Sequence, residues 1–156
     1  YTRTDDPRQA LEKLSGLVPV VVVTCGADGA LAVDSGTGEV ADVPGIPVDA
    51  LDPTGAGDVF TAGFITGTLG GWPLPDRVAF ATLVGALSVQ HFGGSLSAPG
   101  WGDIADWWRA VRADPSRADL ARRFGFLPDV IPPGSRNAVH RATATIARLS
   151  DAQPGY

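Results

Sequence analysis

The chain has 156 residues, of which 44% are hydrophobic and 19% are charged, and its formal net charge is −5. This length is sufficient for one domain with its own hydrophobic core. A net negative charge argues against a basic surface for nucleic acid or anionic membranes, and no apolar run reaches the roughly 18 residues of a membrane helix. We therefore expect no nucleic-acid partner and no membrane partner.

Cys25 is the only cysteine, and the sequence contains no methionine. A single cysteine cannot form an intramolecular disulfide, which fits a reducing compartment, so we expect a cytoplasmic protein. We expect Cys25 to be a small buried side chain rather than a nucleophile, because no histidine lies near it in the sequence. Since residue 1 is not methionine, we also expect the chain to be a piece of a longer protein.

A helix and a buried strand are predicted near the N-terminus. The helix spans residues 7–17, where four apolar side chains recur at helical spacing, namely Ala10, Leu11, Leu14 and Leu17. Residues 19–24 form a β-branched run without polar alternation, which is typical of a strand buried on both faces. A helix followed by such a strand indicates an α/β layer architecture.

Residues 24–30 form a glycine-containing turn after that strand. Gly26 and Gly29 permit close approach of another backbone or a ligand, and the Thr24 hydroxyl can bond a phosphate oxygen. The alternative is an ordinary hairpin turn, because residues 29–33 have the pattern of a second strand.

A third strand is predicted over residues 39–43, and residues 46–48 would extend it. Pro44 and Pro47 lack the N–H group that a sheet ladder needs, so they favour an edge position or the end of the ladder. Residues 49–51 then lead into the most informative stretch of the chain.

This stretch, residues 51–60, reads Leu-Asp-Pro-Thr-Gly-Ala-Gly-Asp-Val-Phe and begins a predicted helix that ends near residue 69. Pro53 imposes an extended or turn conformation on Asp52, and the glycines let the backbone bend sharply. A helix N-terminus presents free N–H groups and a positive dipole end, which favour phosphate binding. Asp58, in the first turn, is well placed to accept a proton from a hydroxyl that attacks phosphate. The alternative is a glycine-rich turn before an ordinary helix, with Asp58 favoured by the dipole alone.

Small residues mark one face of this helix. Gly55, Val59, Gly63 and Gly67 lie one turn apart, and glycine inside a helix costs about 1 kcal/mol relative to alanine. We expect the close approach of another backbone to compensate for this cost. A membrane dimer motif is the alternative, but the segment is too short and too rich in threonine.

The rest of the chain is predicted to be mainly helical. A largely buried helix covers residues 74–91, and Phe60 and Phe64 should point into the same core. An amphipathic helix covers residues 103–113, with four side chains on its apolar side, Ile104, Trp107, Trp108 and Val111, which we expect to be core rather than an interaction patch. The remaining predictions are a loop at 92–99, a helix at 116–124 capped by Ser116, a loop at 125–134, a helix at 135–150 and a frayed end at 151–156.

The stretch from Asp52 to Phe60, followed by Ala-Gly-Phe at residues 62–64, resembles the C-terminal signature of the ribokinase-like (PfkB-type) carbohydrate kinases. The resemblance covers about Val18 to Pro99. It implies an α/β fold, a ribokinase-like three-layer sandwich with a mainly parallel central sheet and helices on both faces, of which this chain is the C-terminal portion only. It also implies two parts: residues 1–100 as the nucleotide-binding and catalytic portion, and residues 101–156 as a helical extension packed on it.

The resemblance also implies the roles of particular residues. Asp58 would be the catalytic base, and the anion hole would consist of Gly55, Ala56 and Gly57. The nucleotide-binding residues would be Thr24, Gly26, Ala27, Gly29, Thr82 and Ala86. Thr82 stands where many family members have Asn or His, so this chain departs from the family pattern at that side chain. The small Ala86 leaves room for a flat base, although alanine in a core helix needs no functional reason.

The cofactors that the resemblance implies are ATP and Mg²⁺, with K⁺ as a third. A monovalent cation would be bound by main-chain oxygens of Asp52, Thr54, Val89, Phe92, Gly94 and Ser97. Carbonyl oxygens suit a hard cation, but backbone ligands leave no pattern of side chains in the sequence. Family members also carry an Asn-X-X-Glu motif linked to Mg²⁺, and this motif is absent here.

The implied activity is ATP-dependent phosphorylation of a hydroxyl on a sugar or related small molecule, with this chain supplying the base, the anion hole and the adenine site. Ribose, fructose, a ketodeoxy acid and a nucleoside are all open as substrates, because the sugar-binding region would lie before this chain. A homodimer through that same missing portion is a further expectation. The alternatives are a non-catalytic nucleotide-binding remnant and a structural fragment that needs its other half to fold.

Overall fold

The computed structural model describes residues 2–135, with Ser95 described by its backbone alone. The elements in chain order are α1 (Pro7–Ser15), β1 (Val20–Thr24), η1 (Gly26–Asp28), β2 (Gly29–Asp34), β3 (Glu39–Pro44), α2 (Ala56–Leu69), α3 (Leu74–Ser88), η2 (Gly94–Ser97), α4 (Trp101–Ala113), η3 (Pro115–Arg117), α5 (Ala118–Arg123) and α6 (Leu127–Val130). From residue 136 on, the predicted helix at 135–150 and the frayed end at 151–156 lie outside the described residues.

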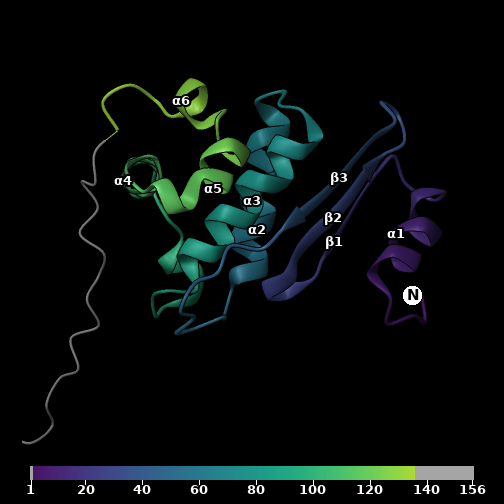
Figure 1. The fold of residues 1–156 in the computed structure, drawn as a ribbon. Helices are drawn as coiled ribbons and strands as arrows, with labels where there is room; N and C mark the ends of the chain where they lie inside the picture. Colours follow the sequence, from purple (N-terminus) through teal and green to yellow (C-terminus); the bar gives the residue numbers. More distant parts are fainter. Residues whose placement is uncertain (1, 136–156) are drawn as a thin grey trace, which may run out of the picture.

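The elements form layers around the sheet (Figure 1). Helix α1 packs on one face, against β1 and β2, and α3 packs on the other face, against β2 and β3. Helix α2 lies against α3, and α4–α6 lie on the side of these helices that faces away from the sheet (Figure 1). The predicted α/β architecture with helices on both faces of a sheet is therefore confirmed.

The sheet itself differs from the prediction. Its three strands lie in the order β1-β2-β3, and both neighbouring pairs are antiparallel, with Ala32 of β2 paired to Val22 and to Ala41. The mainly parallel sheet that we predict is not what these strands form. Parallel neighbours need a crossover of a dozen or more residues, whereas residues 25–28 and 35–38 make short hairpin connections. Residues 46–48 also do not extend β3.

Strand β2 is buried along most of its length because α1 and α3 cover its two faces. In β1, by contrast, Val21 is buried while Val20 and Val22 are half-buried. Among the described strands β1 pairs only with β2, so its outer edge has no strand partner in this part of the chain. The predicted burial of β1 on both faces is therefore only partial among the described residues.

Helix α1 is shorter than predicted. It ends at Ser15, where the Gly16 N–H group donates to the carbonyl oxygen of Leu14. Leu17 therefore leaves the apolar face of the helix and is 74% exposed. The prediction that Leu17 belongs to this helix is wrong, because glycine favours the end of a helix over its continuation.

Helices α2 and α3 approach each other at the predicted glycine face. A Cβ atom built on Gly63 would lie 3.0 Å from the Cα atom of Ala81 and 2.6 Å from a Val84 methyl carbon. One built on Gly67 would lie 3.2 Å from the Cα atom of Arg77. The predicted close backbone approach is confirmed, and it explains why this helix tolerates glycine in its interior.

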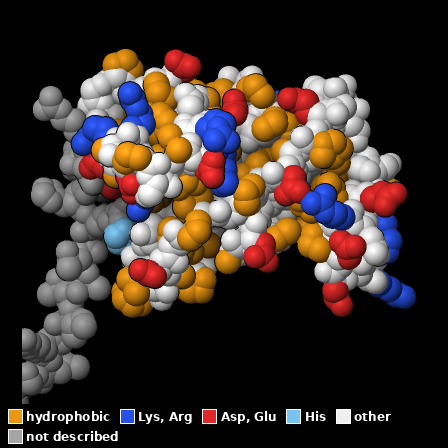
Figure 2. All heavy atoms as spheres, viewed as in Figure 1, with side chains coloured by type: hydrophobic (Ala, Val, Ile, Leu, Met, Phe, Trp, Pro, Cys, Tyr) orange, Lys and Arg blue, Asp and Glu red, His pale blue; other side chains and the backbone are white. Residues whose placement is uncertain are grey.

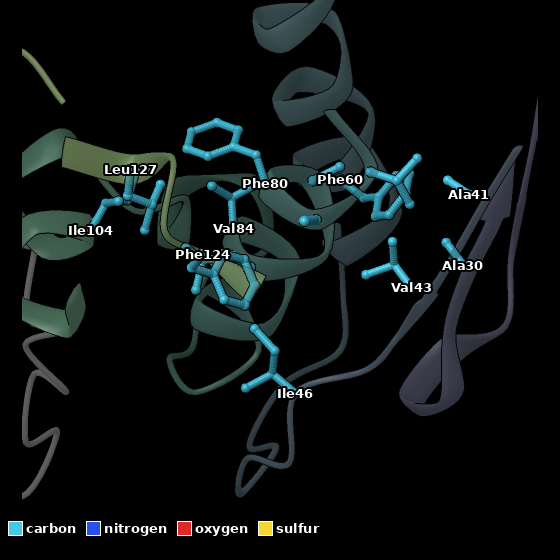
Figure 3. Close-up of a cluster of buried hydrophobic side chains, with 14 of the residues drawn as sticks. Ala30, Ala41, Val43, Ile46, Phe60, Phe80, Val84, Ile104, Phe124 and Leu127 are labelled. Carbon is cyan, nitrogen blue, oxygen red and sulfur yellow. The ribbon is translucent and has the colours of Figure 1, made fainter. Parts of the chain in front are cut away.

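The core continues from the sheet through α2 and α3 into α4–α6. Figure 3 shows Ala41 and Val43 of the sheet near Phe60, Phe124 beside Val84 in the middle of the cluster, and Ile104 and Leu127 at its other end. Phe60 is buried as predicted, while Phe64 is half-buried against the cluster.

Aromatic contacts connect the last helices to α3. The rings of Trp101 and Phe80 stack with centroids 5.5 Å apart, and Trp107 meets Phe124 edge-on at 5.0 Å. Such pairs add to the free energy that burial alone provides. Trp107 and Trp108 therefore pack inward, as predicted, with Trp108 the more deeply buried.

The boundaries of the last helices differ from the predictions. Helix α4 begins at Trp101, where the Gly100 N–H group donates to the Asp103 carboxylate at 2.9 Å. The N-cap of the next helical segment, η3, is Asp114 rather than the predicted Ser116, since the Asp114 carboxylate accepts from the Ser116 N–H group at 2.9 Å. Helix α6 lies inside the predicted loop at 125–134.

The surface view in Figure 2 shows acidic and basic side chains interspersed between apolar ones on this face. None of the helices within residues 2–135 combines the length and apolar character needed to cross a membrane.

Candidate active site

The start of α2 has the geometry of an anion-binding helix N-terminus. Gly55 precedes the helix in the left-handed conformation, with φ 75° and ψ 0°, which a residue with a Cβ atom adopts only with strain. The Ala56 N–H group turns back to the carbonyl oxygen of Pro53 at 3.2 Å. The N–H groups of Gly57 and Asp58 lie in the first turn, where a helix offers no internal acceptor, so they are available to a ligand.

Asp52 connects the start of α2 to the loop that follows α3. One carboxylate oxygen accepts from the Thr54 N–H group at 3.0 Å, and the other accepts from the Gly93 N–H group at 3.3 Å. Hydrogen bonds from the Thr54 hydroxyl, and then from the N–H groups of Thr54 and Gly93, lower the pKa of Asp52 from its ordinary value. The N–H group of Asp52 donates to the Val89 carbonyl oxygen at 3.1 Å, which fixes this residue against the end of α3.

A cavity of about 580 Å³ opens beside these loops. Its walls come from the turn after β1, the segment 45–50, the first turn of α2 and one side of α3. All six predicted nucleotide-binding residues line it, together with Ala56 and Gly57 of the predicted anion hole. Gly55 and Asp58 lie next to the cavity in sequence but do not line it, and the Asp58 side chain is exposed.

Two glycines let the turn after β1 lie directly on the end of β3. A Cβ atom on Gly29 would lie 2.0 Å from the Val43 carbonyl oxygen, and one on Gly45 would lie 1.9 Å from the Ala27 carbonyl oxygen. The Gly45 N–H group donates to the Asp28 carbonyl oxygen at 3.0 Å. The turn is therefore part of a hairpin as well as a wall of the cavity, so the two predicted interpretations are compatible.

Cys25, in the same turn, is half-buried rather than fully buried. Burial raises the pKa of its thiol, and the nearby charges of Asp28 and Asp42 raise it further. A raised pKa disfavours the thiolate, which agrees with the prediction that Cys25 is not a nucleophile.

The lining of the cavity is mainly apolar. Phe60, Ile46 and Val48 contribute to it together with Gly85 and Ala86 of α3. Such an environment suits a flat heteroaromatic base with few polar contacts. The Thr82 hydroxyl donates to the Val78 carbonyl oxygen at 2.9 Å, so its proton is engaged within the helix.

Several of these lining residues have no predicted role in ligand binding. The missed group comprises Gly45, Ile46, Pro47, Val48, Ala50, Pro53, Phe60 and Gly85. Phe60 is predicted only as core, and residues 46–48 only as strand. Gly85 lies three positions after Thr82, so helical spacing could have indicated it as a further small residue on that face of α3. The segment 45–50 has no comparable pattern.

The six residues predicted to bind a monovalent cation lie in neighbouring loops, but their oxygens are only partly available. A Cβ atom on Gly94 would lie 3.7 Å from the Thr54 carbonyl oxygen, so these loops are in contact. The Val89 carbonyl oxygen accepts from the N–H groups of both Leu51 and Asp52, at 2.7 and 3.1 Å, and the Gly94 carbonyl oxygen accepts from the Ser97 hydroxyl at 2.6 Å. The set thus fits a cation only in part, and the potassium site stays a prediction.

Side-chain metal ligands do not gather in this part of the chain either. Within residues 2–135, no group of three or more His, Cys, Asp or Glu side chains could bind a metal ion.

Comparison with known proteins gives the same family as the motif. Residues 2–101 match the family described as pfkB family carbohydrate kinase. Ribokinase from Schizosaccharomyces pombe is 38% identical over 84 residues, which cover 54% of this chain and 26% of the relative. Inositol 3-kinase from Oryza sativa subsp. japonica is 43% identical over 74 residues, covering 47% of this chain and 18% of the relative.

The fold also matches solved structures. The structure of Arabidopsis thaliana ribokinase complexed with ribose and ATP superposes with a TM-score of 0.58 at 31% identity, covering 64% of this chain and 32% of that protein. The fold is therefore ribokinase-like, and the chain spans a third or less of the length of these similar proteins. The match over residues 2–101, which is most of the chain, shows that it belongs to the pfkB family of carbohydrate kinases.

Proposed function

We propose that this chain supplies the ATP-binding and catalytic portion of a kinase that phosphorylates a hydroxyl on a sugar or related small molecule. One observation supports this above all others: the six predicted nucleotide-binding residues lie around a single cavity that also includes the first turn of α2. The complex of the similar Arabidopsis ribokinase with ribose and ATP supports the choice of nucleotide.

In this proposal the nucleotide spans the cavity. The adenine lies in the apolar part, between the 45–48 segment and the small residues of α3. The phosphates extend towards Thr24, Gly26 and the start of α2, where first-turn N–H groups and the positive end of the helix dipole stabilise negative charge. These groups act most strongly on the charge that develops on the transferred phosphoryl group.

Asp58 acts as the general base. Its carboxylate accepts the proton of the substrate hydroxyl while the hydroxyl oxygen forms a bond to the γ-phosphorus. The bond from that phosphorus to the β–γ bridging oxygen breaks, and ADP leaves. The Asp58 side chain is exposed outside the cavity lining, so the acceptor would approach α2 from the side away from the adenine.

Mg²⁺, when bound with the nucleotide, would neutralise phosphate charge. We propose that it arrives with ATP and that its further ligands lie outside these residues, since the Asn-X-X-Glu motif is absent from the sequence. We propose that K⁺ binds main-chain oxygens of the same six residues, Asp52, Thr54, Val89, Phe92, Gly94 and Ser97, and that it takes no part in the transfer itself.

We propose that the acceptor site also lies outside this chain. The chain spans only 26% of the fission-yeast ribokinase, and β1 has an edge without a strand partner among the described residues. On this proposal the isolated chain binds ATP weakly and phosphorylates no sugar, because the acceptor is not placed in line with the γ-phosphate. We also propose that the complete kinase is cytoplasmic and that it forms a homodimer through the portion that carries the acceptor site.

The test is to fill the proposed adenine site. Ala86→Trp adds an indole to the cavity wall, and Ala110→Trp adds one on the exposed side of α4 as a matched control. We expect Ala86→Trp to weaken ADP binding by at least about tenfold, or 1.4 kcal/mol, in isothermal titration calorimetry. Equal affinities in the two variants would contradict the site. Binding without sugar phosphorylation in the complete protein would favour the alternative of a non-catalytic remnant.

A further inference from the structure

The family match ends at residue 101, but the following helices make a contact that reaches the cavity wall. Arg123, the last residue of α5, donates from Nη1 to the carbonyl oxygen of Pro44 at 2.8 Å. These two residues are 79 positions apart in the chain. Pro44 ends β3, immediately before the segment that lines the cavity.

Arg123 is oriented inward, unlike its neighbour in the same helix. Its guanidinium carbon lies 5.9 Å from the centroid of the Phe124 ring, and Phe124 is fully buried. Arg122 instead pairs with Asp119 at 3.0 Å, with 80% of its side chain exposed. Arg123 is half-buried as a residue, and its guanidinium has two defined contacts, the Phe124 ring and the solvent-exposed bond to the Pro44 carbonyl oxygen. A charged donor makes such a bond stronger than a neutral one.

The position of Pro44 affects two walls of the cavity. Towards β2, Pro44 is paired with Gly29, and a Cβ atom on Gly29 would lie 2.7 Å from the Pro44 carbonyl carbon. Towards the cavity, Pro44 continues into Gly45, which touches Ala27. A shift at Pro44 would thus move both the turn at 26–29 and the segment at 45–48.

The segment at 45–48 follows the end of β3 and is not part of the sheet. Pro44 and Pro47 have no N–H group, and β3 has ended, so a sheet ladder does not fix this part of the backbone. The segment is instead attached by the bond from the Gly45 N–H group to the Asp28 carbonyl oxygen at 3.0 Å and by the Ile46 side chain, which is buried in the core. The Arg123 side chain supplies a fixed point from outside the sheet.

We propose that Arg123 is a positioning residue for nucleotide binding, which orders the turn at 26–29 and the wall at 45–48 through the Pro44 carbonyl oxygen. This inference rests on the proposed function, because it takes the ligand of the cavity to be a nucleotide. It gives the helical segment 101–135 a role in the site in addition to its role in the core.

The experiment compares three variants of the 156-residue chain. Arg123→Met removes the donor and keeps much of the apolar stem, Arg123→Lys restores one charged donor, and Arg122→Met is the matched control on the exposed side. We expect Arg123→Met to weaken ADP binding about tenfold, the scale of one charge-assisted hydrogen bond, while Arg123→Lys recovers most of the affinity and Arg122→Met keeps it.

A second measurement separates positioning from general stability and from the choice of ligand. Amide hydrogen exchange without nucleotide should be faster at residues 26–29 and 45–48 in Arg123→Met, and unchanged in α2 and α3. Unchanged exchange in these two segments would overturn the inference, whether or not the chain binds ADP. The inference would also be overturned if Arg123→Lys did not restore ADP affinity and if amide exchange in Arg123→Met were faster throughout the chain. Failure of the wild-type chain to bind any nucleotide would instead count against the proposed function.

Discussion

The cavity is built mainly from backbone groups and small residues, whereas the helical segment 101–135 is built around large aromatic side chains. The cavity walls consist mostly of glycine, alanine, threonine and proline, so backbone groups and the absence of side chains create the space. The last helices contribute Trp101, Trp107, Trp108, Phe124 and Phe126, whose rings fill space. Added side-chain atoms should therefore impair the cavity, whereas removed side-chain atoms should destabilise the packing of the last helices.

The largest effect is expected in the aromatic region. Phe124→Ala removes a fully buried ring that contacts Trp107 and Phe126, and should lower the free energy of unfolding by about 3–5 kcal/mol. Urea denaturation followed by circular dichroism measures this loss. Phe92→Ala is the control, since that ring is 74% exposed. Similar losses of unfolding free energy in both variants would contradict this contrast, because they would show that the last helices do not stabilise the fold through their buried rings.

The next effect concerns the carboxylate in the first turn of α2. In the complete kinase, Asp58→Asn should lower kcat by at least about 10²-fold, the scale of losing a general base. Nucleotide affinity should change little, because asparagine keeps the shape and Asp58 does not line the cavity. Steady-state kinetics with saturating ATP, alongside Asp49→Asn as an exposed acidic control, provide the measurement. A fully active Asp58→Asn enzyme would show that another group is the base.

A smaller effect is expected where backbone meets backbone in the cavity wall. A Cβ atom added by Gly45→Ala would overlap the Ala27 carbonyl oxygen, and overpacking of this kind costs about 1–3 kcal/mol. Gly16→Ala is the matched control, because nothing lies within 4 Å of the added atom. We expect weaker ADP binding and a lower unfolding midpoint only for Gly45→Ala. Unimpaired ADP binding by Gly45→Ala would show that binding does not require the close contact between Gly45 and the turn at 26–29.

The smallest effect is a pH dependence in the last helices. Hydrogen bonds from the Ser116 hydroxyl and N–H group, and then the charge of Arg117, lower the pKa of Asp114 in the folded state. A lowered carboxylate pKa stabilises the folded state above the ordinary pKa, and this contribution is lost as the pH falls through the folded-state value. The difference in unfolding midpoint between wild type and Asp114→Ala should therefore shrink from pH 6 to pH 3. A difference that stays constant would exclude the charge as its source.

Much of the site follows from local sequence. Pro53 and the glycines between Asp52 and Asp58 predict a bend followed by the start of a helix, and both occur. Proline restricts the backbone conformation of the residue before it, and glycine permits conformations that other residues avoid. The β-branched run predicts β1, and the glycine face of α2 predicts a close helix neighbour, which is α3. Thr24, Gly26, Thr82 and Ala86 are predicted to share one ligand through the family resemblance, and they line one cavity.

The tertiary structure alone decides how these pieces meet. The antiparallel order of the sheet follows from the short connections at 25–28 and 35–38, and the apolar pattern of each strand does not specify how the strands pair. The segment 45–48 becomes a cavity wall, rather than the end of a strand, because the turn at 26–29 and residues of α3 line the same cavity. The contact of Arg123 with Pro44 joins residues 79 positions apart. Local preferences determine where a chain bends and which face of a helix is apolar, whereas contacts over such distances exist only once the core has brought the elements together.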